Sequence, residues 1–283
     1  MKTSNLFILF KSRCPNVANL IDKDVNWPRQ QQRYEKYSAR LKKLKPKTKP
    51  TNFIDLLEDI NKNKAFKSFV SYIESEAKYL INTLDSKQIP ALRKIFIGNI
   101  FNFDIPNYLN SLGEIQVLSL LTRNDNFELI KIEAELEASY KLKKADFMFL
   151  DISDNIKKHV EVKNIHLNDE DYENLEVLKI KIESKLQAHI DEKIQYIEKN
   201  VSGEVLTFAP IIWILKIDKI LPIYSFFKEK ETDIHRKTHK GFNYFVFGYL
   251  SMLQNVYEDS LDGYKFGYVT TLLDFYKNYH KID

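Results

Sequence analysis

Hydrophobic residues in the first hundred positions recur three or four residues apart, which is the spacing of amphipathic helices. From about residue 52 to residue 100 this pattern predicts two or three helices. Residues 29–44 predict a polar, basic helix, and Pro46 ends it because proline disfavours a continuing helix. The first part of the chain is therefore expected to be helical.

After Pro106 the pattern changes from one further helix to a series of strands. Residues 108–121 are apolar almost all round, which is typical of a buried helix. Strands are expected next at 127–137, 145–152 and 158–165. The first and third alternate apolar with charged residues, and the second contains an apolar run that suits burial on both faces. The apolar face of the first strand would carry Ile130, Ile132, Ala134 and Leu136.

The most regular helical pattern runs from residue 169 to about residue 200. Asn168 or Asp169 would cap this helix, and a buried strand at 209–217 follows it. These elements predict an α/β fold with a mixed sheet flanked by helices, preceded by a helical N-terminal region. The apolar stripe of the long helix comprises Leu175, Leu178, Ile182, Leu186, Ile190, Ile194 and Ile197.

The distribution of charge sets the beginning of the chain apart. Residues 1–50 contain thirteen Lys or Arg and three Asp or Glu, a net charge of +10, while the rest of the chain carries −6. Such a segment favours a polyanionic partner, and a solvated tail is the alternative. We expect four parts: a basic segment and linker at 1–50, a helical region at 51–105, a core at 106–220, and an aromatic-rich extension of that core at 221–283.

The composition also bears on the compartment. Cys14 is the only cysteine, so neither an internal disulfide nor a cysteine-based zinc site is expected. The apolar run near residue 6 meets Lys11 and Arg13 before it reaches the length of a signal peptide. No stretch approaches the ~20 apolar residues of a membrane span. We therefore expect a cytoplasmic protein that does not associate with membranes.

Candidate chemistry gathers on the second and third expected strands. Glu161 and Lys163 are two residues apart, so they share one face of a strand. Asp146 opens the preceding strand, and a hairpin turning around 153–155 would bring Asp146 and Glu161 within reach of one metal ion. Two carboxylates suit Mg²⁺, with Mn²⁺ as an alternative. A neighbouring lysine can stabilise the charge that develops during phosphodiester hydrolysis.

The order of these elements resembles the PD-(D/E)xK nuclease superfamily of restriction-endonuclease-like phosphodiesterases. The matching segments are Gly113-Glu-Ile-Gln116, Lys144-Ala-Asp-Phe147 and Val160-Glu-Val-Lys-Asn164. The resemblance covers residues 106–220, and Ala145 stands where the motif has proline. The RecB-type Gln-x-x-x-Tyr signature is absent, since Asp191 follows Gln187 at that spacing, so no subfamily is assigned.

The resemblance implies a metal-dependent endonuclease, a hydrolase of nucleic-acid phosphodiester bonds, with DNA more expected than RNA. It implies that Glu114, Asp146 and Glu161 bind Mg²⁺ or Mn²⁺, and that these three residues and Lys163 are catalytic. A homodimer is an open possibility for such an enzyme. Restriction, repair, defence and toxin roles are all compatible with this chemistry.

Several alternatives stay open at the level of sequence. Asp151 or Asp154 would replace Asp146 if the strand register were different. Glu114 would satisfy a helix N-terminus if Ser111-Leu-Gly-Glu114 were a capping box. Asp146, Glu161 and Lys163 would have no catalytic role if they only kept an exposed edge of the sheet soluble.

Two further features are weaker candidates. His235 and His239 have the spacing of two ligands on one helix face, but the basic residues around them favour a phosphate-contacting or solvated loop. The aromatic extension favours core packing over base stacking. For the whole chain, the alternatives to an enzyme are a binding module on a nuclease-like fold and a helical scaffold protein.

Overall fold

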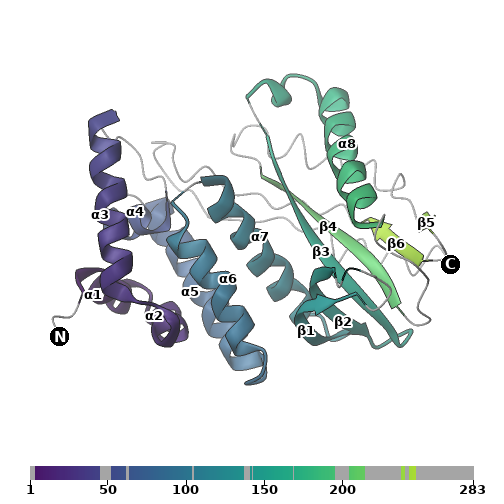
Figure 1. Cartoon of the computed structure of the whole chain (residues 1–283), viewed down its shortest axis with the longest axis horizontal. Helices are drawn as coiled ribbons and strands as arrows, with labels where there is room; N and C mark the ends of the chain where they lie inside the picture. The colour runs from purple at the N-terminus through teal and green to yellow at the C-terminus, as the bar shows by residue number, and fades with distance from the viewer. Residues whose placement is uncertain are drawn as a thin grey trace. The chain divides into compact units, whose positions relative to one another are not determined.

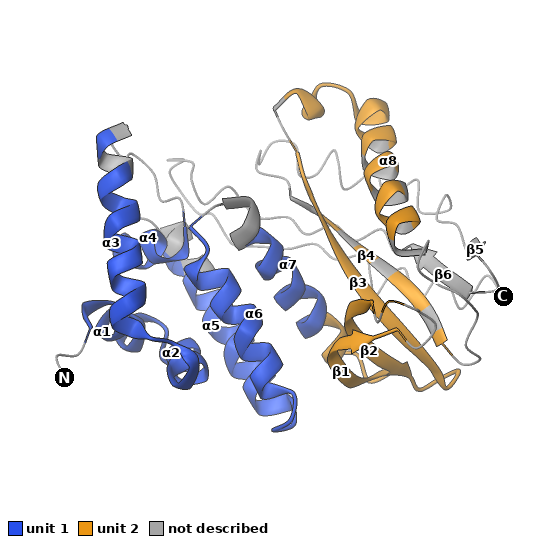
Figure 2. Ribbon diagram, viewed as in Figure 1, with its two compact units in different colours: residues 1–119, 256–266 blue, residues 120–255, 267–283 orange. Residues whose placement is uncertain are grey.

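The computed structural model of this chain describes residues 4–44, 52–61, 64–103, 105–136, 141, 143–167, 169–194, 204–213, 237–239 and 242–246. Figure 1 shows helices in the first part of the chain and a sheet in the second. They belong to two compact units (Figure 2): among the described residues, a helical unit contains those up to residue 119 and a sheet unit contains those from residue 120. No helix among the described residues is long and apolar enough to cross a membrane.

The helical unit contains seven α-helices in the described residues. They are α1 (Asn5–Arg13), α2 (Pro15–Ile21), α3 (Trp27–Leu44), α4 (Phe53–Glu58), α5 (Lys64–Thr83), α6 (Ile89–Phe101) and most of α7 (Ile105–Thr122), with a short 3₁₀ helix at Asp22–Asp24. The expected helices at 29–44, between 52 and 100, and at 108–121 are thus confirmed. This compact unit also takes in the residues that were expected to form a basic segment of their own.

Aromatic rings hold the first helices of this unit together. Phe10 of α1 is fully buried, and its ring centroid lies 5.5 Å from that of Trp27, 6.0 Å from that of Phe53 and 6.1 Å from that of Phe101. Tilted and edge-on ring pairs at these separations are favourable beyond the burial of their apolar area. Helices α1, α3, α4 and α6 therefore share one core.

Polar contacts also join helices of this unit. Glu74 of α5 accepts hydrogen bonds from the backbone amides of Asn16 (2.6 Å) and Val17 (3.1 Å), at the start of α2. These two amides have no partner inside their own helix, and a carboxylate complements the positive end of the helix dipole. The carboxylate therefore ties α5 to α2.

The described residues of the sheet unit form a six-stranded mixed sheet in the order β1-β2-β3-β4-β6-β5. Its strands are β1 (Phe127–Glu135), β2 (Lys144–Asp151), β3 (Ile156–His166), β4 (Glu204–Trp213), β5 (Lys237–His239) and β6 (Phe242–Val246). Pairing is antiparallel for β1–β2, β2–β3 and β5–β6, and parallel for β3–β4 and β4–β6. Helix α8 (Leu175–Ile194) connects the parallel strands β3 and β4. The expected mixed α/β architecture with a helical N-terminal part is confirmed.

The strand boundaries agree with the alternation pattern, with two differences. Strand β4 begins at Glu204, five residues before the expected start, and residues 214–217 lie outside the described part. Strand β1 has a bulge between Leu129 and Lys131, which places Ile130 on the exposed side instead of the buried one. Ile130 is the extra residue of this bulge, and it interrupts the two-residue alternation of the strand, so its side chain turns to the other face. Beyond the bulge, Ile132, Ala134 and Leu136 are buried as expected.

The long helix starts later than its sequence pattern indicates. Residues Asp169–Tyr172 form a 3₁₀ helix, and α8 begins at Leu175. Its N-cap is Asn174, whose side-chain oxygen accepts from the amides of Glu176 (3.0 Å) and Val177 (3.2 Å), so neither Asn168 nor Asp169 caps α8. Leu178 is buried as expected. The side chains of Ile182, Leu186, Ile190, Ile194 and Ile197 lie outside the described part.

Candidate functional site on strands β2 and β3

The β2–β3 hairpin brings the two strand carboxylates to one place. The two strands pair from Asp151 opposite Ile156 to Phe147 opposite Val160. The pairing ends there, and one further step of the same register would place Asp146 opposite Glu161. Residues directly opposite in an antiparallel pair share a face, with Cβ atoms about 4.5–5.5 Å apart. The two carboxylates can therefore approach one divalent ion, for which Mg²⁺–oxygen distances are about 2.0–2.1 Å.

Asp146 is held at the point where the β2–β3 ladder ends. Its Oδ2 accepts a hydrogen bond of 2.6 Å from the backbone amide of Val162. The carboxylate thus takes an amide of β3 that a continuing ladder would have used. Asp146 is half-buried, so this contact orients a carboxylate at an accessible end of the strand pair.

Lys163 lies two residues beyond Glu161 on β3 and therefore on the same face of the sheet. Its side chain is half-buried. It makes no hydrogen bond and no ion pair to the part of the chain that the structure describes. An ammonium on the same face of the sheet as two carboxylates, and outside any ion pair among these residues, can interact with an anionic ligand.

The structure adds His189, which the sequence did not single out. His189 projects from α8, and its Nε2 lies 3.2 Å from Oε1 of Glu161. Both side chains are nearly buried, with 11% and 9% of their surfaces exposed. Helix α8 therefore covers the face of β3 that carries Glu161 and Lys163, and His189 fixes one oxygen of the Glu161 carboxylate.

A second buried polar pair lies on the same face, further from Lys163. His159 is two residues before Glu161, and its Nε2 comes within 3.3 Å of Oε2 of Glu204 on β4. Both side chains are almost completely buried. This face of β3 is therefore closed on the His159 side and more exposed on the Lys163 side.

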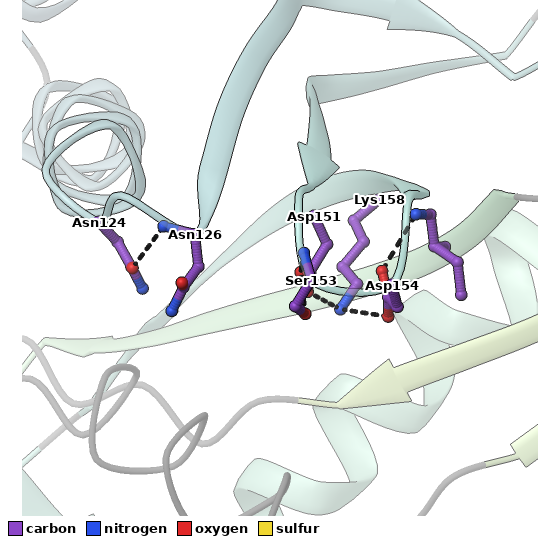
Figure 3. A network of polar contacts seen from close by, with 7 residues as sticks. Asn124, Asn126, Asp151, Ser153, Asp154 and Lys158 are labelled. Atoms are coloured by element: carbon purple, nitrogen blue, oxygen red, sulfur yellow. Dashed lines mark hydrogen bonds and ion pairs between the residues drawn. The ribbon is translucent and has the colours of Figure 1, made fainter.

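The alternative carboxylates on this hairpin have a structural role instead. Asp151 is five residues from Asp146, which places it on the opposite face of β2. It is fully buried, and its Oδ2 lies 2.5 Å from Nζ of Lys158, while its Oδ1 accepts from the hydroxyl of Ser153 at 2.6 Å (Figure 3). Asp154 adds a carboxylate oxygen at 3.7 Å from the same ammonium. Neither residue replaces Asp146.

The ion pair also determines the pKa of Asp151. Burial works to raise this pKa, but the hydrogen bonds from Lys158 and Ser153 outweigh it and hold the pKa below the usual value of 3.8. The nearby ring of Phe127 lies 5.8 Å from the Lys158 ammonium, a cation–π contact on the same face. The charged form of Asp151 is thus part of the folded structure.

Glu114 belongs to α7, whose residues up to 119 are in the helical unit. Helix α7 begins at Ile105, so Ser111 and Glu114 lie inside the helix and the capping-box interpretation is wrong. Ser111 instead faces Gly98 of α6, where a Cβ atom would meet its Oγ at 3.1 Å. Glu114 is half-buried, and its assignment to the metal site stays a prediction.

Only one of the two remaining metal-ligand candidates lies in the described part of the chain. His239 lies on strand β5, and His235 falls outside the described part, as does most of the aromatic extension. Among the described residues, no group of three or more His, Cys, Asp and Glu side chains is arranged to hold a metal ion. The site on the hairpin therefore offers two carboxylates, Asp146 and Glu161.

Comparison with known proteins does not identify a family for this chain. No family model matches it, and neither a curated protein nor a solved structure matches it. The geometry of the β2–β3 hairpin and the chemistry of its side chains are therefore what bear on function.

Proposed function

We propose that this chain is a metal-dependent nuclease with a restriction-endonuclease-like core, and that it hydrolyses phosphodiester bonds in nucleic acid, DNA in preference to RNA. One observation carries the proposal: Asp146 accepts a hydrogen bond from the Val162 amide, next to Glu161, and Lys163 lies on the same face of β3 as Glu161. The order of helix, antiparallel strands, crossover helix and parallel strand agrees with the superfamily that the sequence resembles.

The donor set suits the proposed ion. Mg²⁺ in enzyme sites is commonly bound through one or two carboxylates and keeps several of its waters, so Asp146 and Glu161 suffice to hold it together with a substrate phosphate. When bound, the ion neutralises charge that develops on the phosphate and makes a bound water more acidic. Glu114 is the third expected carboxylate. Mn²⁺, which takes the same oxygen ligands, is the alternative ion.

The side chains of the hairpin would divide the remaining work. Asp146 is oriented by the Val162 amide, and Glu161 is oriented by His189, so both carboxylates are positioned before any ligand arrives. Lys163 would place its ammonium against a phosphate oxygen and stabilise the additional negative charge of the transition state. The exposed end of this face, next to Lys163, is where substrate would enter.

The test is a cleavage assay with Mg²⁺ on linear, circular, single-stranded and branched DNA and on RNA. Asp146→Ala and Glu161→Ala should each abolish cleavage, because each removes ligand oxygens. Glu173→Ala is a matched control, since Glu173 is an exposed carboxylate of the same unit that lies on neither strand of the hairpin. Wild-type cleavage by both site variants would disprove the proposal.

A non-catalytic binding module is the second candidate, and one observation favours it. The hydrogen bond from the Val162 amide to Asp146 and the contact between His189 and Glu161 also satisfy these carboxylates in a purely structural role. In that case the protein would bind nucleic acid without cleaving any of the substrates above. Thermal stabilisation by millimolar Mg²⁺, lost in Asp146→Ala, separates the two candidates because an ion that binds only the folded state raises its stability.

A further inference from the structure

One face of α3 carries five basic side chains and no acidic one. Arg29, Arg33, Lys36, Arg40 and Lys43 follow one another at intervals of three or four residues. At about 100° per residue they fall within an arc of about 80° around the helix axis. All five side chains are exposed. We refer to these five residues as the α3 stripe.

Most of the charge on the α3 stripe is uncompensated within the described part of the chain. Arg29, Lys36, Arg40 and Lys43 make no side-chain hydrogen bond or ion pair there. Glu35 is the only acidic residue of α3, and it accepts a hydrogen bond from Gln31 on another side of the helix. With a rise of 1.5 Å per residue, the stripe is a line of positive charge about 21 Å long.

The opposite face of α3 fixes the stripe to the helical unit. Trp27 and Tyr34 are buried, and the Tyr34 hydroxyl donates to Oδ1 of Asp55 at 2.6 Å. The Trp27 ring lies 5.9 Å from that of Phe101. Figure 2 shows α3 at the margin of the helical unit. The basic side chains are thus presented by a packed helix and not by a loose tail.

We propose that the α3 stripe binds the sugar–phosphate backbone of nucleic acid, which makes it a second contact surface for the partner of the proposed nuclease. Nucleic acid carries a dense, regular row of negative charge, and cations that neutralise its phosphates gain affinity by releasing counterions. Such contacts position a protein on its substrate without reading sequence. The inference depends on the proposed function only for the identity of the partner.

Two other acidic partners fit the α3 stripe less well. A helix that lies on an anionic membrane needs an exposed apolar face, and no large hydrophobic side chain is exposed among the described side chains of α3. A protein partner would require aromatic or apolar anchors at the centre of the surface. The stripe instead consists of charges of a single sign.

Substitution is a better test than truncation. Phe10 and Trp27 lie in the core of the helical unit, so deleting the first 44 residues would remove buried side chains together with the charge. The variant R29Q/K36Q/R40Q/K43Q removes four exposed charges and leaves Arg33, whose guanidinium lies 5.5 Å from the Phe103 ring centroid. The control K23Q/K67Q/K78Q/K87Q removes four exposed lysines from other parts of the same unit.

Binding is measured by fluorescence anisotropy on a 30-base-pair DNA duplex and on the same sequence as an RNA duplex, with EDTA present so that no cleavage occurs. The stripe variant should reduce the slope of log K against log salt by about 3 to 4, and lower the affinity on the order of 10²- to 10³-fold at 100 mM salt. The control variant should change the slope by less than about 1. R29Q/R40Q should give about half of the full effect, and R29K/R40K should bind as the wild type does.

Three results would overturn the proposal. The first is equal loss of binding in the stripe and control variants, which would indicate a general charge effect. The second is unchanged duplex binding by a stripe variant that circular dichroism shows to be folded, or no duplex binding by the wild type. The third is stripe-dependent binding to phosphatidylserine vesicles that is tighter than binding to either duplex. Because EDTA removes any metal, failure here leaves the Asp146 and Glu161 cleavage test unaffected.

Discussion

The two ends of the β2–β3 hairpin place the same kinds of side chain in opposite circumstances. Next to the turn, Asp151 and Lys158 form an ion pair of 2.5 Å that is almost completely buried. At the other end, Asp146 and Glu161 share a face with Lys163, which is half-buried and has no ion-pair partner among the described residues. At the first end, the charges of Asp151 and Lys158 neutralise each other. At the second end, the Lys163 ammonium has no ion-pair partner among the described residues and can bind an anionic ligand.

The difference arises from the two-residue period of a strand. Asp146 and Asp151 are separated by an odd number of residues, as are Lys158 and Lys163, so each pair occupies opposite faces of the sheet. On one face the carboxylate and ammonium lie directly over the turn and meet. On the other face the carboxylates are engaged by a backbone amide and by His189. Identical residue types thus support the fold at one end, and at the other they are the residues to which the proposed chemistry is assigned.

The largest expected effect is on turnover, and it concerns Lys163 at the end of the hairpin far from the turn. Lys163→Ala should lower turnover by a factor on the order of 10²–10⁴, as expected for loss of a positioned electrostatic or acid–base group. Metal binding should persist, because the ammonium is not a ligand. Single-turnover cleavage beside metal titration measures both quantities, and Lys87→Ala serves as an exposed control. An unchanged cleavage rate would remove Lys163 from the proposed site.

The next largest expected effect is on stability, and it concerns the ion pair between Asp151 and Lys158 next to the turn. Lys158→Met leaves Asp151 buried without its cation, which should lower the free energy of unfolding by ~3–5 kcal/mol in urea titrations near neutral pH. Lys157→Met is the control, since Lys157 is more exposed and only 4.0 Å from Glu204, and it should cost less than about 1 kcal/mol. Equal losses of unfolding free energy in the two variants would show that the buried ion pair contributes no more to stability than the exposed one.

The same pair predicts a dependence on pH. The folded pKa of Asp151 lies below its ordinary value of 3.8, so its contribution to stability is fully present above that value and is lost as the pH falls through the folded pKa. The difference in stability between the wild type and Lys158→Met should therefore shrink as the pH falls below about 4. Thermal unfolding at a series of acidic pH values tests this, and a constant difference would contradict it.

The smallest expected effect is on metal affinity, and it concerns the contact between His189 and Glu161. His189→Ala removes the imidazole that fixes Oε1, which should weaken metal binding about 10- to 100-fold, as is usual for residues that orient a ligand. His189→Gln retains an N–H donor and should recover part of this loss, which a purely packing role would not explain. Calorimetric affinities for Mn²⁺ that are equal in the wild type and His189→Ala would exclude the positioning role.

Much of this comparison follows from the sequence. Alternation in β1 and β3 and the apolar run in β2 located these strands within two residues at each end, and the hairpin turn around 153–155 placed Asp146 and Glu161 on one face. The odd spacing of Asp146 and Asp151 already separates their faces. These features depend on a period that every strand obeys, so local sequence is sufficient to predict them.

Other features depend on contacts between distant segments. His189 reaches Glu161 only because α8 crosses back over β3, and no spacing within the helix indicates that approach. The bulge that exposes Ile130 and the 3₁₀ turn that delays α8 to Leu175 are local irregularities that interrupt a periodic pattern without changing its composition. The basic character of residues 29–44 is visible in the sequence, but its exposure as one stripe depends on the packing of Trp27 and Tyr34.

The most direct test of the account is calorimetric titration of Mn²⁺ into the wild type, Asp146→Asn and Asp151→Asn, each confirmed as folded by circular dichroism. Asp146→Asn should lose metal binding because it removes an anionic ligand from the Asp146–Glu161 end of the hairpin. Asp151→Asn should keep the wild-type affinity, although it should be less stable because Lys158 loses its partner. Equal affinity in Asp146→Asn and the wild type, or loss of binding only in Asp151→Asn, would contradict the assignment of the metal site to Asp146 and Glu161.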